Sequence, residues 1–205
     1  MFFLFLPILH GQRSPTFADE FNGPALDLAR WVPHDPFSRA AGDLSVSGGQ
    51  LHLAPGGALS TFGIFAQKYG RFEIRARSTA AKGLHPRFRL MPIPLGLLPA
   101  IDVFETSGAP TKVSFANRWG SEQTERSFGD SFTVADLSAG FHILAIEWER
   151  DHIAWFVDGK EKFRSIDGVP HQPMYLLIDL PGEREGGLTF DIDYVHVYGP
   201  PDPAH

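Results

Sequence analysis

The sequence predicts an all-β protein, an antiparallel β-sandwich. Short segments of alternating polar and apolar residues recur along the chain, and no long window carries a helical period. Aromatic residues make up 13% of the sequence and accompany 21 Gly and 17 Pro, which is typical of short strands joined by turns. A chain of 205 residues suits one domain with one core. We expect that domain at 17–200, between an apolar N-terminal segment (1–16) and a C-terminal tail (201–205).

The clearest strand pattern lies at 70–77. Phe72, Ile74 and Ala76 fall on one face there and charged residues on the other, which predicts a half-buried strand. Asp158-Gly159 is a strong hairpin signal, with a strand expected on each side of it. The further strands are expected at 142–148, 153–157, 160–166 and 191–198.

Composition excludes several classes of function. The net charge of −6 gives no basic footprint for nucleic acid. The absence of cysteine excludes disulfides, thiolate metal sites and cysteine nucleophiles. No His-x-x-x-His pair lies on an expected strand or helix with a matching carboxylate, so a transition-metal site is not expected.

Acidic residues interrupt an apolar run at 100–105, which reads Ala-Ile-Asp-Val-Phe-Glu. In a regular strand Asp102 and Glu105 point to opposite faces. One extra residue, a β-bulge, would turn Glu105 onto the face of Asp102, and bulges often re-aim side chains beside active sites. On the residues alone, a surface strand with two solvated acids explains the pattern equally well.

This segment is similar to the Glu-Ile-Asp-x-Phe-Glu signature of glycoside hydrolase family 16, the laminarinase and β-glucanase family, except that Ala100 replaces the first Glu. The resemblance implies a concanavalin A-like jelly roll whose concave face forms a cleft for β-glucan or a related β-linked polysaccharide. It covers about 17–198, and the other matching segments follow in family order at 17–23, 67–77, 141–148, 157–160 and 193–198.

The resemblance also implies roles for the residues of this strand. Family members hydrolyse with retention, using two carboxylates about 5 Å apart. By position, Glu105 is the acid/base, Asp102 is the helper, and Ala100 stands where the nucleophile is expected. Since a methyl group cannot attack an anomeric carbon, we expect O-glycosyl hydrolase activity to be lost or much reduced while polysaccharide binding remains.

The expected substrate-binding residues depart from the family pattern. Where the family shows Gly-Leu-Trp-Pro-Ala-Phe-Trp, the stretch 83–89 has lost both Trp, and Leu97 replaces a third. Losing these flat platforms removes sugar stacking and leaves basic residues near the cleft. Drift after loss of catalysis explains this, and so does a cleft rebuilt for an anionic ligand. The residues expected to bind substrate are Trp119, Arg118, Arg89, His85 and Arg87; for Trp119, a place in the core is the alternative.

A structural calcium ion is a further implication of the resemblance, held by the backbone oxygen of Glu20 and by Asp193. Asp193 capping a strand is the alternative. No other cofactor is expected. The N-terminal segment begins with nine largely apolar residues, too short to span a bilayer, and is either a truncated signal peptide or an apolar strand or tail. We expect an extracellular or periplasmic location because the resemblance concerns extracellular polymers.

Three classes of function remain open. The first is a non-catalytic polysaccharide-binding protein, a pseudoenzyme of the family. The second is an active hydrolase or transglycosylase with a relocated nucleophile, or an inverting enzyme that pairs Glu105 with a distant base. The third is a structural or protein-binding sandwich with a vestigial cleft. A polysaccharide is the expected partner, with no nucleic acid and no membrane span; the sequence does not specify the oligomeric state.

Overall fold

The computed structural model describes residues 14–37, 43–78, 85–106, 108–182 and 189–201. Most of the N-terminal segment 1–16, with its expected signal peptide or apolar strand, lies outside these ranges, and so does most of the C-terminal tail. No helix in the described part of the chain is long and apolar enough to cross a membrane.

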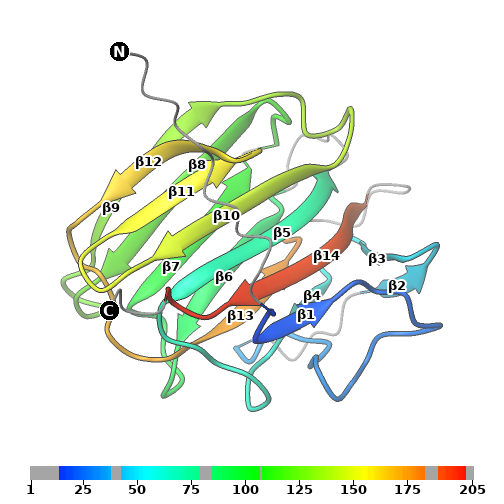
Figure 1. Ribbon diagram of the computed structural model, residues 1–205, viewed down its shortest axis with the longest axis horizontal. Helices are drawn as coiled ribbons and strands as arrows, with labels where there is room; N and C mark the ends of the chain where they lie inside the picture. The colour runs from blue at the N-terminus through cyan, green and yellow to red at the C-terminus, as the bar shows by residue number, and fades with distance from the viewer. Residues whose placement is uncertain (1–13, 38–42, 79–84, 107, 183–188, 202–205) are drawn as a thin grey trace.

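Every regular element in the described ranges is a β-strand, and the strands form two antiparallel sheets (Figure 1). The eight-stranded sheet runs β12-β11-β10-β5-β14-β3-β2, with β1 also paired to β14, and the six-stranded sheet runs β4-β13-β6-β7-β8-β9. The strands are β1 (Phe17–Asp19), β2 (Leu44–Ser47), β3 (Gln50–Leu53), β4 (Ala58–Ser60), β5 (Gly70–Ser78), β6 (Arg87–Pro92), β7 (Ala100–Thr106), β8 (Lys112–Trp119), β9 (Arg126–Thr133), β10 (His142–Trp148), β11 (Ile153–Val157), β12 (Lys160–Ser165), β13 (Met174–Asp179) and β14 (Phe190–Tyr198). The predicted all-β sandwich is confirmed.

The core lies between the two sheets, where alternate residues of facing strands meet. Phe72 and Ile74 of β5 are fully buried, as the alternating pattern predicted. Trp148 and Trp155 belong to the same core, and Trp155 Nε1 donates a hydrogen bond across it to the carbonyl oxygen of Asp102, at 2.9 Å. This bond ties the middle of β7 to the opposite sheet.

The hairpin expected at Asp158-Gly159 joins β11 to β12. Both residues have positive φ angles, 49° and 75°, as the two central residues of a type I′ turn require. The return strand β12 ends at Ser165, one residue before its expected end.

The outer face of β5 differs from the solvated face that the sequence predicted. The side chain of Glu73 is largely buried there, with only 9% of the residue exposed. Arg71 Nε donates to its carboxylate at 2.8 Å, and the Tyr194 hydroxyl donates at 3.3 Å. Burial of this charge is tolerated because it is paired and hydrogen-bonded.

Candidate functional site

Strand β7 carries the irregularity that the sequence predicted. Its pairing with β8 shifts register between Asp102 and Glu105, and its pairing with β6 shifts between Phe88 and Arg89. Val103 and Phe104, although consecutive, both belong to the buried core between the sheets. The extra residue therefore places Glu105 on the outer face of the sheet, the face of Asp102. The predicted bulge is confirmed.

Ala100 lies on the same outer face, but its surroundings are apolar. It is fully buried and packs in a small cluster with Met91, Tyr175 and Leu177, separate from the main core. Its register partner in the neighbouring strand β8 is Arg118. Position 100 therefore offers a methyl group beside an arginine, with no carboxylate of its own.

Asp102 is nearly buried between two arginines. Arg118 Nη2, from β8, donates to Asp102 Oδ1 at 3.3 Å, and Arg89 is its register partner in β6. Burial raises the pKa of the Asp102 carboxyl above its usual range, although the charges of Arg118 and Arg89 act in the opposite direction. This carboxyl therefore takes up a proton more readily than an exposed Asp does.

Asp179, the last residue of β13, completes the charged part of this face. It accepts hydrogen bonds from Arg87, through Nε at 3.2 Å and also through Nη2, and from Arg89 Nη2 at 3.4 Å. Arg87 pairs in register with Asp179 on one side and Glu105 on the other. Asp179 was not among the residues predicted from the sequence. The signal for it was an acid placed four residues after Tyr175, on the same face of a strand that is otherwise wholly apolar.

The remaining predicted binding residues lie at the two ends of β7. His85 is half-buried, and its Nδ1 lies 3.0 Å from the carbonyl oxygen of Thr106. Trp119 is also half-buried and follows Arg118, near the Ala100 end. Its ring lies so close to Gly168 that a Cβ there would come within 2.1 Å of it. The structure thus gathers the three arginines around Asp102 and leaves His85 and Trp119 at the margins.

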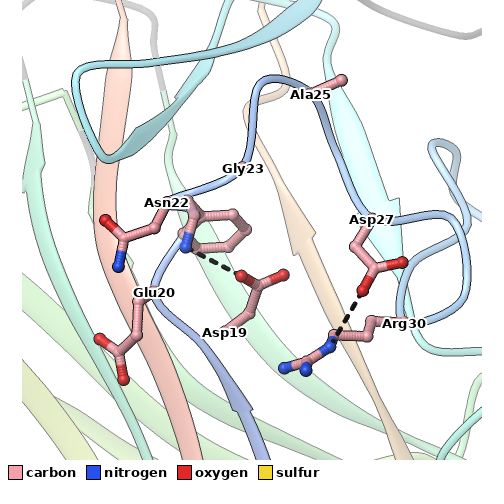
Figure 2. Close-up of a pocket in the computed structure, with 8 residues that line it drawn as sticks. Asp19, Glu20, Asn22, Gly23, Ala25, Asp27 and Arg30 are labelled. Atoms are coloured by element: carbon pink, nitrogen blue, oxygen red, sulfur yellow. Dashed lines mark hydrogen bonds and ion pairs between the residues drawn. The ribbon is translucent and has the colours of Figure 1, made fainter.

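The region expected to hold calcium pairs its carboxylates with basic side chains of the protein. Asp193 accepts from Arg75, and the Glu20 carboxylate lies beside His196 Nε2. Figure 2 shows the neighbouring pocket of about 290 Å³, lined by Asp19, Glu20, Phe21, Asn22, Gly23, Ala25, Asp27 and Arg30.

The acids of this pocket are engaged as well. Asp19 accepts from Trp31 Nε1 and from the Phe21 amide, and Asp27 pairs with Arg30. Within the described ranges no group of three or more His, Asp or Glu is placed to hold a metal. Calcium takes six to eight oxygen ligands, which these paired side chains do not supply. Calcium stays a prediction, to be tested by comparing melting temperatures in calcium and in EGTA.

His196 predicts a pH dependence of stability. Its Nε2 lies 2.5 Å from Glu20 Oε1, and its Nδ1 lies 3.8 Å from Glu73 Oε1. Burial, the largest single effect, lowers the pKa of His196, but the nearby carboxylates of Glu73 and Glu20 outweigh it and raise the pKa overall. A raised pKa contributes stability below the unfolded value of about 6.5, and this contribution is lost as the pH rises through the folded value.

We therefore expect His196→Gln to lower the free energy of urea unfolding more at pH 6 than at pH 9. Glu20→Gln should reduce the same dependence because it removes one of the two partners. A difference between wild type and His196→Gln that does not change with pH would contradict this account.

The family model described as glycosyl hydrolases family 16 matches residues 39–183, more than half of the chain. The chain belongs to this family. Endo-1,3-1,4-beta-glycanase ExsH of Rhizobium meliloti is 34% identical over 153 residues, which cover 69% of this chain and 33% of the relative. A beta-1,3-glucan-binding protein of Penaeus monodon is 28% identical over 119 residues, covering 49% of this chain and 32% of the relative. The chain spans about a third of the length of the curated relatives it matches first.

Solved structures of two bacterial and archaeal glucan-degrading enzymes show the same fold. The laminarinase catalytic domain of Thermotoga maritima aligns with a TM-score of 0.77 and 21% identity, covering 93% of this chain and 99% of that one. The endo-beta-1,3-glucanase of Pyrococcus furiosus aligns with a TM-score of 0.78 and 20% identity, covering 91% and 94%. The jelly roll expected from the resemblance is therefore confirmed.

Proposed function

We propose that this chain binds a β-linked polysaccharide, β-glucan or a related polymer, and that its O-glycosyl hydrolase activity is lost or much reduced. Membership of family 16 supports the choice of ligand, together with relatives named as glycanases and as a glucan-binding protein. An extracellular or periplasmic location is part of the proposal, because such polymers lie outside the cytoplasm.

Ala100 is the observation that carries the loss of activity. It shares the outer face of β7 with Asp102 and Glu105. Unlike these two acids, it belongs to a buried apolar cluster. In our assignment Glu105 remains the acid/base and Asp102 the helper. Glu105 keeps the carboxyl that would protonate a leaving oxygen, but no carboxylate at position 100 attacks the anomeric carbon. The glycosyl ester that a retaining enzyme needs therefore does not form.

A second candidate is an inverting hydrolase, and Asp179 favours it. Asp179 in β13 and Glu105 in β7 lie on the two sides of Arg87, which belongs to the strand between them, β6. Two strand spacings separate their backbones by about 9–10 Å, near the roughly 6.5–9.5 Å between the carboxyls of inverting enzymes. Against this role, the Asp179 carboxylate is paired with Arg87 and Arg89, which leaves it little freedom to activate water.

Binding and hydrolysis are separated by two parallel measurements. We expect the protein to sediment with insoluble β-1,3-glucan and to release reducing sugar from laminarin at a rate near background. Binding without hydrolysis supports the proposal. Hydrolysis that survives Glu105→Ala would show that the catalytic residues lie elsewhere. Absence of both would favour a structural or protein-binding sandwich.

A further inference from the structure

Three hydrogen-bonding groups on the outer face of the six-stranded sheet have no partner. They are Arg89 Nε, Arg118 Nε and the Tyr175 hydroxyl, here called the donor cluster. They make up three of the five buried side-chain polar atoms that lack a hydrogen bond within the described ranges. Each such atom costs free energy in the folded protein, so several on one face point to a missing acceptor.

Register and contacts bring the donor cluster together around β7. Arg118 is opposite Ala100, Arg89 is opposite Asp102, and the two arginines therefore flank the strand. Tyr175 packs in the same apolar cluster as Ala100. The charge of Arg89 acts on both Tyr175 and Asp102, so Arg89 lies near each of them.

The arginines of the donor cluster are only weakly held by the protein's own acids. Arg118 contacts Asp102 at 3.3 Å and Glu125 at 3.8 Å, and Arg89 contacts Asp179 at 3.4 Å. Arg87, by contrast, makes a bidentate contact with the Asp179 carboxylate. A well-formed charged hydrogen bond is usually 2.7–2.9 Å long, so Arg89 and Arg118 keep capacity for a better acceptor.

Tyr175 adds a neutral donor. The whole residue is buried, and burial, assisted by Asp35, raises the pKa of its hydroxyl to about 12. The phenol therefore keeps its proton at neutral pH and donates. Burial also raises the pKa of Asp102, which weakens the repulsion that an incoming anion meets there.

We propose that the donor cluster binds an anionic substituent, a carboxylate or a sulfate, carried by the β-linked glycan. This inference rests on the proposed function and names the class of its ligand. Arginine suits the role because its planar fork matches carboxylate and sulfate. Of the two explanations left open for the basic residues, the donor cluster favours a rebuilt site over drift.

The test compares matched glucans by titration calorimetry. We expect carboxymethylated β-1,3-glucan to bind about tenfold more tightly than neutral laminarin at low salt, with the ratio falling in 0.5 M NaCl. Laminarin sulfate distinguishes sulfate from carboxylate. Free glucuronate and inorganic sulfate show whether the anion alone suffices.

Three variants test the donor cluster itself. Arg89→Gln and Arg118→Gln should each lower the ratio of acidic to neutral affinity about tenfold. Tyr175→Phe changes no charge and should lower the ratio several-fold, while its melting temperature stays equal to or above that of wild type because an unpaired buried hydroxyl is removed. The matched control is Arg164→Gln, since Arg164 lies on β12 of the other sheet, paired with Glu161.

Each outcome decides the inference. An equal affinity for acidic and neutral glucan overturns it and leaves the proposed function standing, whereas failure to bind either glucan overturns both. A loss with Arg164→Gln as large as with Arg118→Gln would show a general effect of net charge and also overturn it. An unchanged ratio in a folded Tyr175→Phe protein would also overturn the inference, because the proposed site includes the Tyr175 hydroxyl.

Discussion

Ala100→Glu is expected to raise hydrolysis of an aryl β-glycoside by roughly 10²-fold or more over the unaltered protein, with retention of anomeric configuration. The physical reason is that a carboxylate returns to the face that already holds Asp102 and Glu105. Reducing-sugar release and NMR of the first-formed anomer measure the rate and the stereochemistry.

Recovery should be partial, and the fold should lose stability. Ala100 is fully buried against Met91, Tyr175 and Leu177, so four added heavy atoms overpack this cluster at a cost of about 1–3 kcal/mol. Arg118, the register partner of residue 100, offers the new carboxylate a partner that limits the cost of its charge.

Two controls make this result specific. Ala100→Gln has nearly the same shape without the nucleophile and should stay at background. Adding Glu105→Gln to Ala100→Glu should remove the gained activity because the acid/base is lost. The same Glu should also compete with an acidic glycan for Arg118. A gain with Ala100→Gln, or none with a folded Ala100→Glu, would contradict the assignment of position 100.

The sequence predicted the strands with alternating patterns because each buries one face. It also predicted the bulge in β7, since Asp102 and Glu105 share a face only if one residue is extra. It did not predict the environment of these residues. The burial of Glu73 depends on Arg71 and Tyr194, and Tyr194 lies 121 residues away along the chain. Such pairing over long sequence separation leaves no local signal.

Asp179 and Tyr175 were missed because their neighbours depend on the order of the strands. Both follow the period of a strand that looks wholly apolar, and only the sheet order β13-β6-β7 places them beside Arg89 and Ala100. The sequence predicted that the three arginines lie near the cleft. It did not predict that Asp179 pairs with two of them. The partners of a charged residue in a sheet depend on strand order, which the sequence did not supply.

Asp179→Ala is expected to destabilise the fold by about 3–5 kcal/mol, the usual cost of removing one partner of a buried ion pair. The carboxylate is 8% exposed, and its loss leaves Arg87 and Arg89 without their shared acceptor. Asp179→Asn keeps one hydrogen-bond acceptor and should cost less. Urea unfolding measures both values. Asp151→Ala is the control, because Asp151 is exposed and its ion pair is with the neighbouring His152, so its removal should have little effect.

The same variant decides between the two candidate functions. If Asp179 is a structural partner of the arginines, the hydrolysis gained in Ala100→Glu should persist when Asp179→Asn is added to it. The two proteins are compared at a temperature where both are folded. An inverting enzyme predicts the reverse: measurable hydrolysis by the unaltered protein, with inversion, abolished by Asp179→Asn. That result would move the catalytic base from β7 to β13 and overturn the proposal that activity is lost with the carboxylate at position 100.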